Sequence, residues 1–220
     1  MIKLVAFDWN GTLLSDTKPV VDADNMVLKK LGLPPITVSQ FRDIFAVPLA
    51  EYYAACGVGR ELYLKRSREV EGWFHAAYEE RAKRVRTRSG ARQLLHWLEE
   101  RKIASVIFSN HTYEGIHFQL QRLDIAQYFS EVLARDIHNG PVEKRIKGPK
   151  LEAYIEAHNY KKSEVLIVAD GIEEIEIAKT LGISCATITG GYTSAARLKG
   201  ASPDFLIDSL IGLEKIIEKL

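Results

Sequence analysis

Two aspartates follow apolar segments, in positions where a catalytic carboxylate is expected. Asp8 comes directly after residues 4–7, and Asp170 comes directly after residues 165–169. Both segments have the character of buried strands, and ligand sites in open α/β sheets form at the carboxyl ends of strands. A carboxylate at such a site serves as a nucleophile or as a metal ligand. Because Asp8 alone is equally explained by a turn that it caps, only its combination with further groups favours catalysis.

A hydroxyl and an ammonium group accompany the two aspartates. Ser109 follows the apolar segment 104–108, and Lys147 precedes Asp170 by the length of one helix and one strand. Such groups hold the oxygens of an anionic ligand. Each also has an ordinary explanation, as a helix cap or as a solvated lysine. Their shared place at or beside the carboxyl ends of predicted strands is hard to obtain from structural needs alone.

The elements that would position these residues alternate between strand and helix. Short apolar segments predict strands at residues 3–7, 104–108, 131–133, 165–169 and 184–187, with a sixth at 205–207. Helical spacing of apolar residues predicts helices at 90–101, 113–123, 149–158, 173–181 and 209–219. This alternation is typical of an α/β fold, a doubly wound parallel sheet with helices on both faces.

One helical block interrupts the alternation after the first strand. The pattern there predicts three helices, at residues 20–31, 38–55 with a break at Pro48, and 60–83. We therefore predict two domains, an α/β core of residues 1–16 and 88–220 and a helical cap domain of residues 17–87. The polar stretches 15–18 and 85–90 are the expected hinges.

Several aromatic residues of the predicted cap are candidates to face the cleft between the domains. Arg42, Phe45, Tyr52 and Tyr53 lie in or beside its second helix. Aromatic residues at helical spacing more often face the core of their own domain, and the run at 73–78 has the same character. The sequence leaves both placements open.

Four motifs, in order along nearly the whole chain, resemble those of the haloacid dehalogenase-like superfamily. Residues 8–12, Asp-Trp-Asn-Gly-Thr, resemble its DxDGT motif, and residues 104–110 resemble its strand ending in a serine. Residues 147–151, Lys-Gly-Pro-Lys-Leu, resemble its lysine motif, and residues 165–174 resemble its strand followed by GDxxxD. The resemblance implies phosphoryl transfer, a HAD-like Rossmannoid sheet of order 3-2-1-4-5, and a cap like that of phosphoglycolate phosphatases.

The resemblance also implies a role for each matching residue. Asp8 would attack phosphorus and form an aspartyl-phosphate. The residues implied to bind Mg²⁺ are Asp8, Asn10 through its backbone carbonyl, Asp170 and Glu174. The residues implied to bind the phosphoryl group are Gly11, Thr12, Ser109, Asn110 and Lys147. Lys150 remains a rival for the lysine, and Glu173 for the last acid.

Asn10 departs from the motif, because phosphatases of the superfamily have an aspartate there that shuttles a proton. An amide does not titrate near neutral pH, so a rate contribution of about 10² to 10⁴ is at risk. One interpretation is a phosphatase for good leaving groups, or one with a substitute base such as His111. A second interpretation is an enzyme that cleaves a different bond. A third is a phosphate-binding or regulatory protein with little turnover. Deamidation of the Asn10-Gly11 pair to an aspartate is a further hypothesis.

Composition excludes several classes of protein. The 30 Lys and Arg residues against 29 Asp and Glu residues leave no global field that would attract nucleic acid or an anionic membrane. The apolar runs are far shorter than the roughly 20 residues that cross a bilayer. Cys56 and Cys185 lack the spacing of a zinc or redox motif. We interpret both as small buried hydrophobic residues of a protein in a reducing cytoplasm. We expect a cytoplasmic Mg²⁺-dependent phosphatase that acts on a small phosphorylated metabolite, and the sequence leaves its oligomeric state open.

Overall fold

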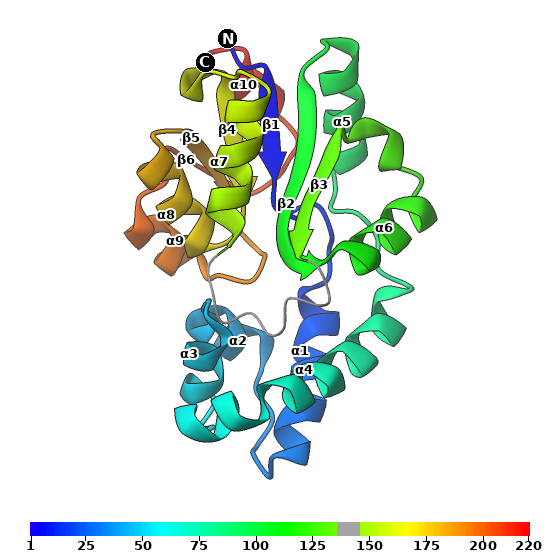
Figure 1. The fold of residues 1–220 in the computed structure, drawn as a ribbon, viewed down its shortest axis with the longest axis vertical. Helices are drawn as coiled ribbons and strands as arrows, with labels where there is room; N and C mark the ends of the chain where they lie inside the picture. Colours follow the sequence, from blue (N-terminus) through cyan, green and yellow to red (C-terminus); the bar gives the residue numbers. More distant parts are fainter. Residues whose placement is uncertain (136–145) are drawn as a thin grey trace.

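A six-stranded parallel sheet forms the centre of the protein, whose structure is a computed structural model describing residues 1–135 and 146–220 (Figure 1). The strands are β1 (Leu4–Phe7), β2 (Ala104–Thr112), β3 (Glu131–Arg135), β4 (Val165–Ala169), β5 (Ser184–Ile188) and β6 (Phe205–Ile207). Their order is β3-β2-β1-β4-β5-β6, and all five pairings are parallel. The predicted fold class and the order 3-2-1-4-5 are confirmed, with β6 as an added edge strand.

Helices cover both faces of the sheet. One face carries α5 (Ala91–Glu100), α6 (Tyr113–Arg122) and α10 (Leu213–Ile217), and the other carries α7 (Lys147–Ala157), α8 (Ile172–Leu181) and α9 (Ala195–Ala201). Short 3₁₀ helices lie at Ala126–Tyr128 and Lys162–Glu164. Two separate hydrophobic clusters, one on each face, hold the layers together.

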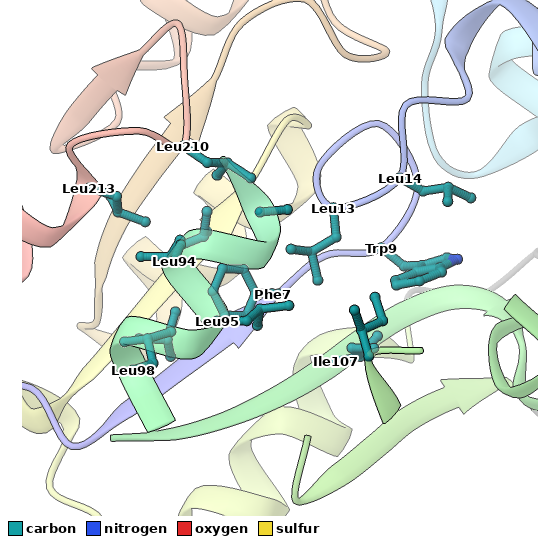
Figure 2. Packing of buried hydrophobic residues seen from close by; sticks show 14 of the residues in the cluster. Phe7, Trp9, Leu13, Leu14, Leu94, Leu95, Leu98, Ile107, Leu210 and Leu213 are labelled. Atoms are coloured by element: carbon teal, nitrogen blue, oxygen red, sulfur yellow. The ribbon is translucent and has the colours of Figure 1, made fainter. Parts of the chain in front are cut away.

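Strand β1 lies in the middle of these layers and is buried on both faces. Val5 and Phe7 belong to the cluster under α5, whereas Leu4 and Ala6 belong to the cluster under α7 and α8. Figure 2 shows Phe7 among the leucines of α5. Strand β1 lies between β2 and β4. Asp8, the residue that follows Phe7, therefore lies in the middle of the carboxyl edge of the sheet.

A separate all-helical region lies beyond the carboxyl end of the sheet (Figure 1). Its helices are α1 (Thr17–Lys30), α2 (Val38–Ile44), α3 (Leu49–Ala55) and α4 (Arg60–Ala82). They enclose a hydrophobic cluster of their own, built mainly from residues 20–82. This cluster supports our proposed division into a core of residues 1–16 and 88–220 and a cap of residues 17–87. In the part of the chain that the structure describes, no helix combines the length and the apolar character that crossing a membrane requires.

The two chain segments that connect the cap to the core run side by side. Leu14 and Thr87 form an isolated antiparallel bridge, and the Ser15 N–H donates to the Arg86 carbonyl at 2.9 Å. The Arg88 guanidinium donates to the carbonyl of Gly11 at 2.5 Å and to that of Thr189 at 2.6 Å. The returning connection is therefore tied to the turn that follows β1.

Some element boundaries differ from those that the sequence predicts. Strand β2 continues to Thr112, so Ser109 and Asn110 lie within a strand rather than after it. Its pairing with β3 shifts register between Phe108 and Thr112, over the same stretch in which its residues are polar. The predicted break at Pro48 is confirmed, since α3 begins directly after it.

Candidate active site

Asp8 and Lys147 form a buried ion pair at the centre of the site. The Asp8 N–H donates to the Val168 carbonyl at 2.9 Å, which fixes the turn that follows β1. The Lys147 Nζ, in the first turn of α7, donates to Asp8 Oδ1 at 2.5 Å and also to Glu174 Oε1. Asp8 is 7% exposed and Lys147 is 3% exposed, so water screens this pair weakly.

Burial and neighbouring charges shift the pKa values of this pair. Burial raises the pKa of Asp8 to about 6, although Lys147 partly opposes the shift. Burial lowers the pKa of Lys147, but the carboxylates of Asp8 and Glu174 more than offset it and the net shift is upward. Lys147 therefore stays cationic at neutral pH, as a group that binds phosphoryl oxygens must.

Asp170, directly after β4, is held beside Asp8 by a hydroxyl and a backbone amide. The Thr12 hydroxyl donates to Asp170 Oδ1 at 2.6 Å, with a longer contact of 3.4 Å to Asp8 Oδ2. The Tyr192 N–H donates to Asp170 Oδ2 at 2.5 Å. Thr12, predicted to bind substrate, is wholly buried, and its hydroxyl orients the Asp170 carboxylate in this structure.

Two glycines allow the backbone to approach Asp170 this closely. Gly11 has φ +74°, and a Cβ on it would lie 2.3 Å from Asp170 Oδ2. A Cβ on Gly191 would lie 2.1 Å from the same oxygen. Any side chain at these positions would displace the carboxylate.

Asp16 joins the site although it was not predicted from the sequence. It is 0% exposed and ends the turn that begins at Asp8. Its Oδ1 accepts the Gly11 N–H at 2.8 Å, and its Oδ2 accepts the Tyr78 hydroxyl at 2.7 Å and the Tyr192 hydroxyl at 2.9 Å. The amide of Gly11, predicted to bind a phosphoryl oxygen, is therefore already donated to Asp16. Burial raises the pKa of Asp16.

Strand β2 contributes Ser109, Asn110 and His111. Ser109 Oγ accepts the His111 N–H at 3.2 Å, which leaves the hydroxyl hydrogen of Ser109 for a ligand. Asn110 Nδ2 donates to Glu173 Oε2 at 2.7 Å, so this predicted substrate-binding residue holds an acid of α8. Burial lowers the pKa of His111 to about 4. At pH 7 the imidazole is neutral but holds a proton only weakly, so His111 is a weak candidate for the substitute base.

The positions of two pairs of rival residues differ clearly. Lys147 reaches Asp8, whereas Lys150 Nζ donates to the Ala134 carbonyl away from the aspartates. Glu174 accepts from Lys147, and Glu173 accepts from Asn110. Of the two lysines, Lys147 is the one that contacts Asp8, and of the two glutamates, Glu174 is the one that contacts Lys147.

The donor set suits a magnesium ion with few protein ligands. Among residues 1–135 and 146–220, no three His, Cys, Asp or Glu side chains form a cluster of the kind that holds a metal. Asp8 and Asp170 are two buried carboxylates, and the pKa of Asp170 is raised by burial and then by the charge of Asp8. Mg²⁺ typically takes one or two carboxylates with carbonyls, waters and substrate phosphate, so a cation here would relieve this repulsion.

A cavity of about 380 Å³ joins these residues to the cap. Its core end is lined by Asp8, Asn10, Ser109, Lys147 and Asp170, so the predicted site residues of three strand ends do meet. Its cap end is lined by Phe45, Tyr52, Tyr53, Tyr63, Phe74 and Tyr78.

Arg42, the remaining candidate for the cleft, has a different role. It is absent from the cavity wall, and its guanidinium donates to the carbonyls of Gly190 and Gly191 at 2.7 and 2.9 Å. The end of α2 is thereby fastened to the core loop that supplies Tyr192. Phe45 and Tyr192 pack edge to face, with their ring centroids 5.2 Å apart, in the same contact.

Comparison with known proteins gives a consistent result. The family model for haloacid dehalogenase-like hydrolase matches residues 5–188. A phosphoglycolate phosphatase of Vibrio parahaemolyticus is 26% identical over 224 residues, which cover 98% of this chain and 96% of that protein. A phosphoglycolate phosphatase of Pseudomonas fluorescens is 25% identical, covering 96% and 78%. A haloacid dehalogenase-like family protein from Streptococcus pneumoniae has the same fold, with a TM-score of 0.82, 18% identity and 98% of each chain covered.

Proposed function

Because the chain belongs to the haloacid dehalogenase-like hydrolases, we propose that it hydrolyses a small phosphate monoester through an aspartyl-phosphate on Asp8. The observation that carries this proposal is the contact of Lys147 with Asp8 at the cavity wall, beside Ser109. A nucleophilic carboxylate with a fixed cation and a hydroxyl donor next to it is the minimum that attack on a phosphate requires. The phosphoglycolate phosphatases among its relatives support the reaction class.

The reaction divides into two steps. In the first, an Asp8 carboxylate oxygen bonds to phosphorus while the bond from phosphorus to the ester oxygen breaks, and the departing alkoxide takes a proton from solvent and leaves as the alcohol. In the second, water attacks phosphorus and gives a proton to solvent, the bond from phosphorus to the Asp8 oxygen breaks, phosphate is released and the Asp8 carboxylate is restored. Lys147 and the hydroxyl of Ser109 hydrogen-bond the phosphoryl oxygens as negative charge develops on them.

Asp8, Asp170 and the backbone carbonyl of Asn10 are the groups that would hold Mg²⁺. Bound there, Mg²⁺ would neutralise charge on both the nucleophile and the phosphoryl group. Glu174, predicted as a further ligand, keeps Lys147 in place through its hydrogen bond. Thr12 and the Tyr192 N–H fix the Asp170 carboxylate for the same purpose.

A second function is a phosphate-binding or regulatory protein with little turnover. Asn10 favours it, because its side chain is hydrogen-bonded to Asp16 and Tyr78 and has no proton to shuttle. The two functions share the binding site and differ in whether the ester bond breaks.

Hydrolysis of p-nitrophenyl phosphate separates them, because an activated leaving group needs little help from an acid. We expect Mg²⁺-dependent release of phosphate by the wild type, and loss of about 10³-fold or more in Asp8→Asn, which removes the nucleophile. Asp22→Asn is the matched control, since Asp22 lies on the cap helix α1 and pairs with Lys18. Equal rates in wild type and Asp8→Asn would rule out the proposed nucleophile and favour the binding protein.

A further inference from the structure

A second buried carboxylate faces the cavity from the cap. Asp24, in the middle of α1, is 3% exposed and lines the cavity wall. Its Oδ2 accepts the Tyr52 hydroxyl at 2.8 Å, and its Oδ1 accepts the Tyr53 hydroxyl at 3.0 Å. Both donors are neutral, so these bonds orient the carboxylate without balancing its charge.

The two tyrosines bonded to this carboxylate belong to a cluster of aromatic rings. The rings of Tyr53 and Tyr63 are stacked with centroids 4.9 Å apart, and those of Tyr52 and Tyr53 lie 5.1 Å apart. Phe45 packs against Tyr52 at 5.4 Å. We call Asp24 with Phe45, Tyr52, Tyr53 and Tyr63 the cap subsite.

Among the residues that the structure describes, three Lys or Arg side chains line the cavity, and each is bonded to other protein groups. Lys147 bonds to Asp8 and Glu174, and Arg135 pairs with Glu71. Arg197 donates to the backbone carbonyls of Arg42 and Phe45. The carbonyl partners of Arg197 are neutral and do not balance its charge. At Asp24 itself, a leaving group that carries a carboxylate would meet a like charge, and like charges in a buried site repel strongly.

We propose that the cap subsite binds a cationic organic group, an amine or a quaternary ammonium, and that the substrates are phosphate monoesters of amino alcohols. The proposal rests on the proposed function, because the phosphate end of such an ester would occupy the Asp8 and Lys147 end of the same cavity. Aromatic faces attract cations, most strongly away from water, and the ionised form of Asp24, which a bound cation favours, adds an opposite charge. Hydrolysis would transfer the phosphoryl group to water and release the amino alcohol with its nitrogen unchanged.

Two isosteric esters test the charge directly. Phosphocholine and 3,3-dimethylbutyl phosphate differ in a quaternary nitrogen against a quaternary carbon, so they share shape. The ammonium group also makes choline the more acidic leaving alcohol, and this difference does not depend on Asp24. We expect kcat/KM for phosphocholine to exceed that for the neutral ester by about tenfold or more, and to exceed that for 2-phosphoglycolate as well. Equal values for the isosteres, or a preference for 2-phosphoglycolate, would overturn the proposal.

The ratio of kcat/KM for the two isosteres also identifies the residue. Asp24→Asn should lower this ratio by about tenfold or more relative to the wild type, whatever happens to the absolute rates, because it removes the charge, keeps the size and leaves the acidity of the two alcohols unchanged. Asp22→Asn, on the exposed side of the same helix, should keep the wild-type ratio. An unchanged ratio in Asp24→Asn would show that Asp24 does not select the cation.

Calorimetric titration with choline separates this proposal from the proposed hydrolysis. We expect choline to bind the metal-free protein at least about tenfold more tightly than 3,3-dimethylbutanol, and Asp24→Asn to lose that difference. If p-nitrophenyl phosphate is not hydrolysed but choline still binds in this way, the phosphatase fails and the subsite stands. If p-nitrophenyl phosphate is hydrolysed while choline and its neutral analogue bind equally, the subsite fails and the phosphatase stands.

Discussion

Asn10 and Asp16 are bonded to each other, with Asn10 Nδ2 donating to Asp16 Oδ2 at 2.6 Å. Asn10 thus stands where a proton-shuttling acid is expected, and a carboxylate stands directly behind it. The same Nδ2 also donates to the hydroxyl of Tyr78, which in turn donates to Asp16. An amide suits this place because it supplies the hydrogens that a second carboxylate would lack.

Asn10→Asp should therefore not restore a proton shuttle by itself. It would place a carboxylate oxygen against the buried Asp16 Oδ2, and the repulsion should lower the free energy of unfolding by on the order of 2 kcal/mol at pH 7. The double variant Asn10→Asp with Asp16→Asn exchanges donor and acceptor and should recover that loss. Thermal unfolding and p-nitrophenyl phosphate turnover check both variants. A single variant as stable as the wild type and more active would contradict the importance of the pair.

Lys147→Met should lower turnover by about 10²-fold or more, because it removes the cation that faces developing charge on the phosphoryl group. It also leaves Asp8 and Glu174 without their shared donor. Lys150→Met, one turn further along α7, is the control and should stay within about threefold of the wild type. Steady-state kinetics with p-nitrophenyl phosphate decides, and similar losses in both variants would remove the distinction between the two lysines.

Gly191→Ala should weaken metal activation, because its Cβ would lie 2.1 Å from Asp170 Oδ2 and force the carboxylate to move. We expect the Mg²⁺ concentration for half-maximal activity to rise by about 10- to 100-fold. Gly200→Ala provides the comparison, since a Cβ on this residue of α9 would meet nothing within 4 Å beyond the backbone of its own helix and its chain neighbours. It should leave the Mg²⁺ requirement unchanged, and an unshifted requirement in Gly191→Ala would argue against Asp170 as a ligand.

Asp24→Asn should stabilise the protein at high pH. Burial raises the pKa of Asp24 from 3.8 to about 7, because the folded protein favours the neutral carboxyl over the carboxylate. The contribution of Asp24 to the free energy of unfolding is therefore complete below pH 3.8 and is lost as the pH rises through 7. Removing the charge should increase the free energy of unfolding by roughly 2–4 kcal/mol at pH 8, with the gain vanishing near pH 4. Urea unfolding at several pH values measures it. A gain independent of pH would mean that Asp24 is not the titrating group.

Much of the fold was predictable because β1 and β4 are apolar without interruption, as strands buried on both faces must be. The predicted ends of strands and helices were wrong where polar residues or a glycine interrupt the hydrophobic pattern. Strand β2 continues past its apolar residues through Ser109 and Asn110 to Thr112, which pairs with Arg135 after a register shift, so the end of the apolar run does not mark the end of the strand. Helix α10 begins at Leu213 instead of Ser209, because Gly212 takes a left-handed conformation with φ 90°.

The site was predictable where it depends on strand ends, as with Asp8 and Asp170. It was not predictable where side chains meet through a turn, as with Asp16, because spacing along the chain does not show which way the turn at Gly11 folds back. Asp24 did leave a signal. It lies four residues from Val20 and four from Leu28, on the apolar face of α1, where a charged residue calls for an explanation.

The paired connections to the cap bear on how the chain folds. Strands β1 and β2 are neighbours in the sheet, yet the whole cap separates them in sequence. Bringing the ends of so long a flexible segment together costs entropy and slows folding. If the cap folds first, it holds Ser15 and Arg86 at hydrogen-bonding distance, so β1 and β2 need to close only residues 8–14 and 87–103, of which 91–100 form the helix α5. We therefore expect the cap, besides enclosing the cavity, to speed assembly of the sheet.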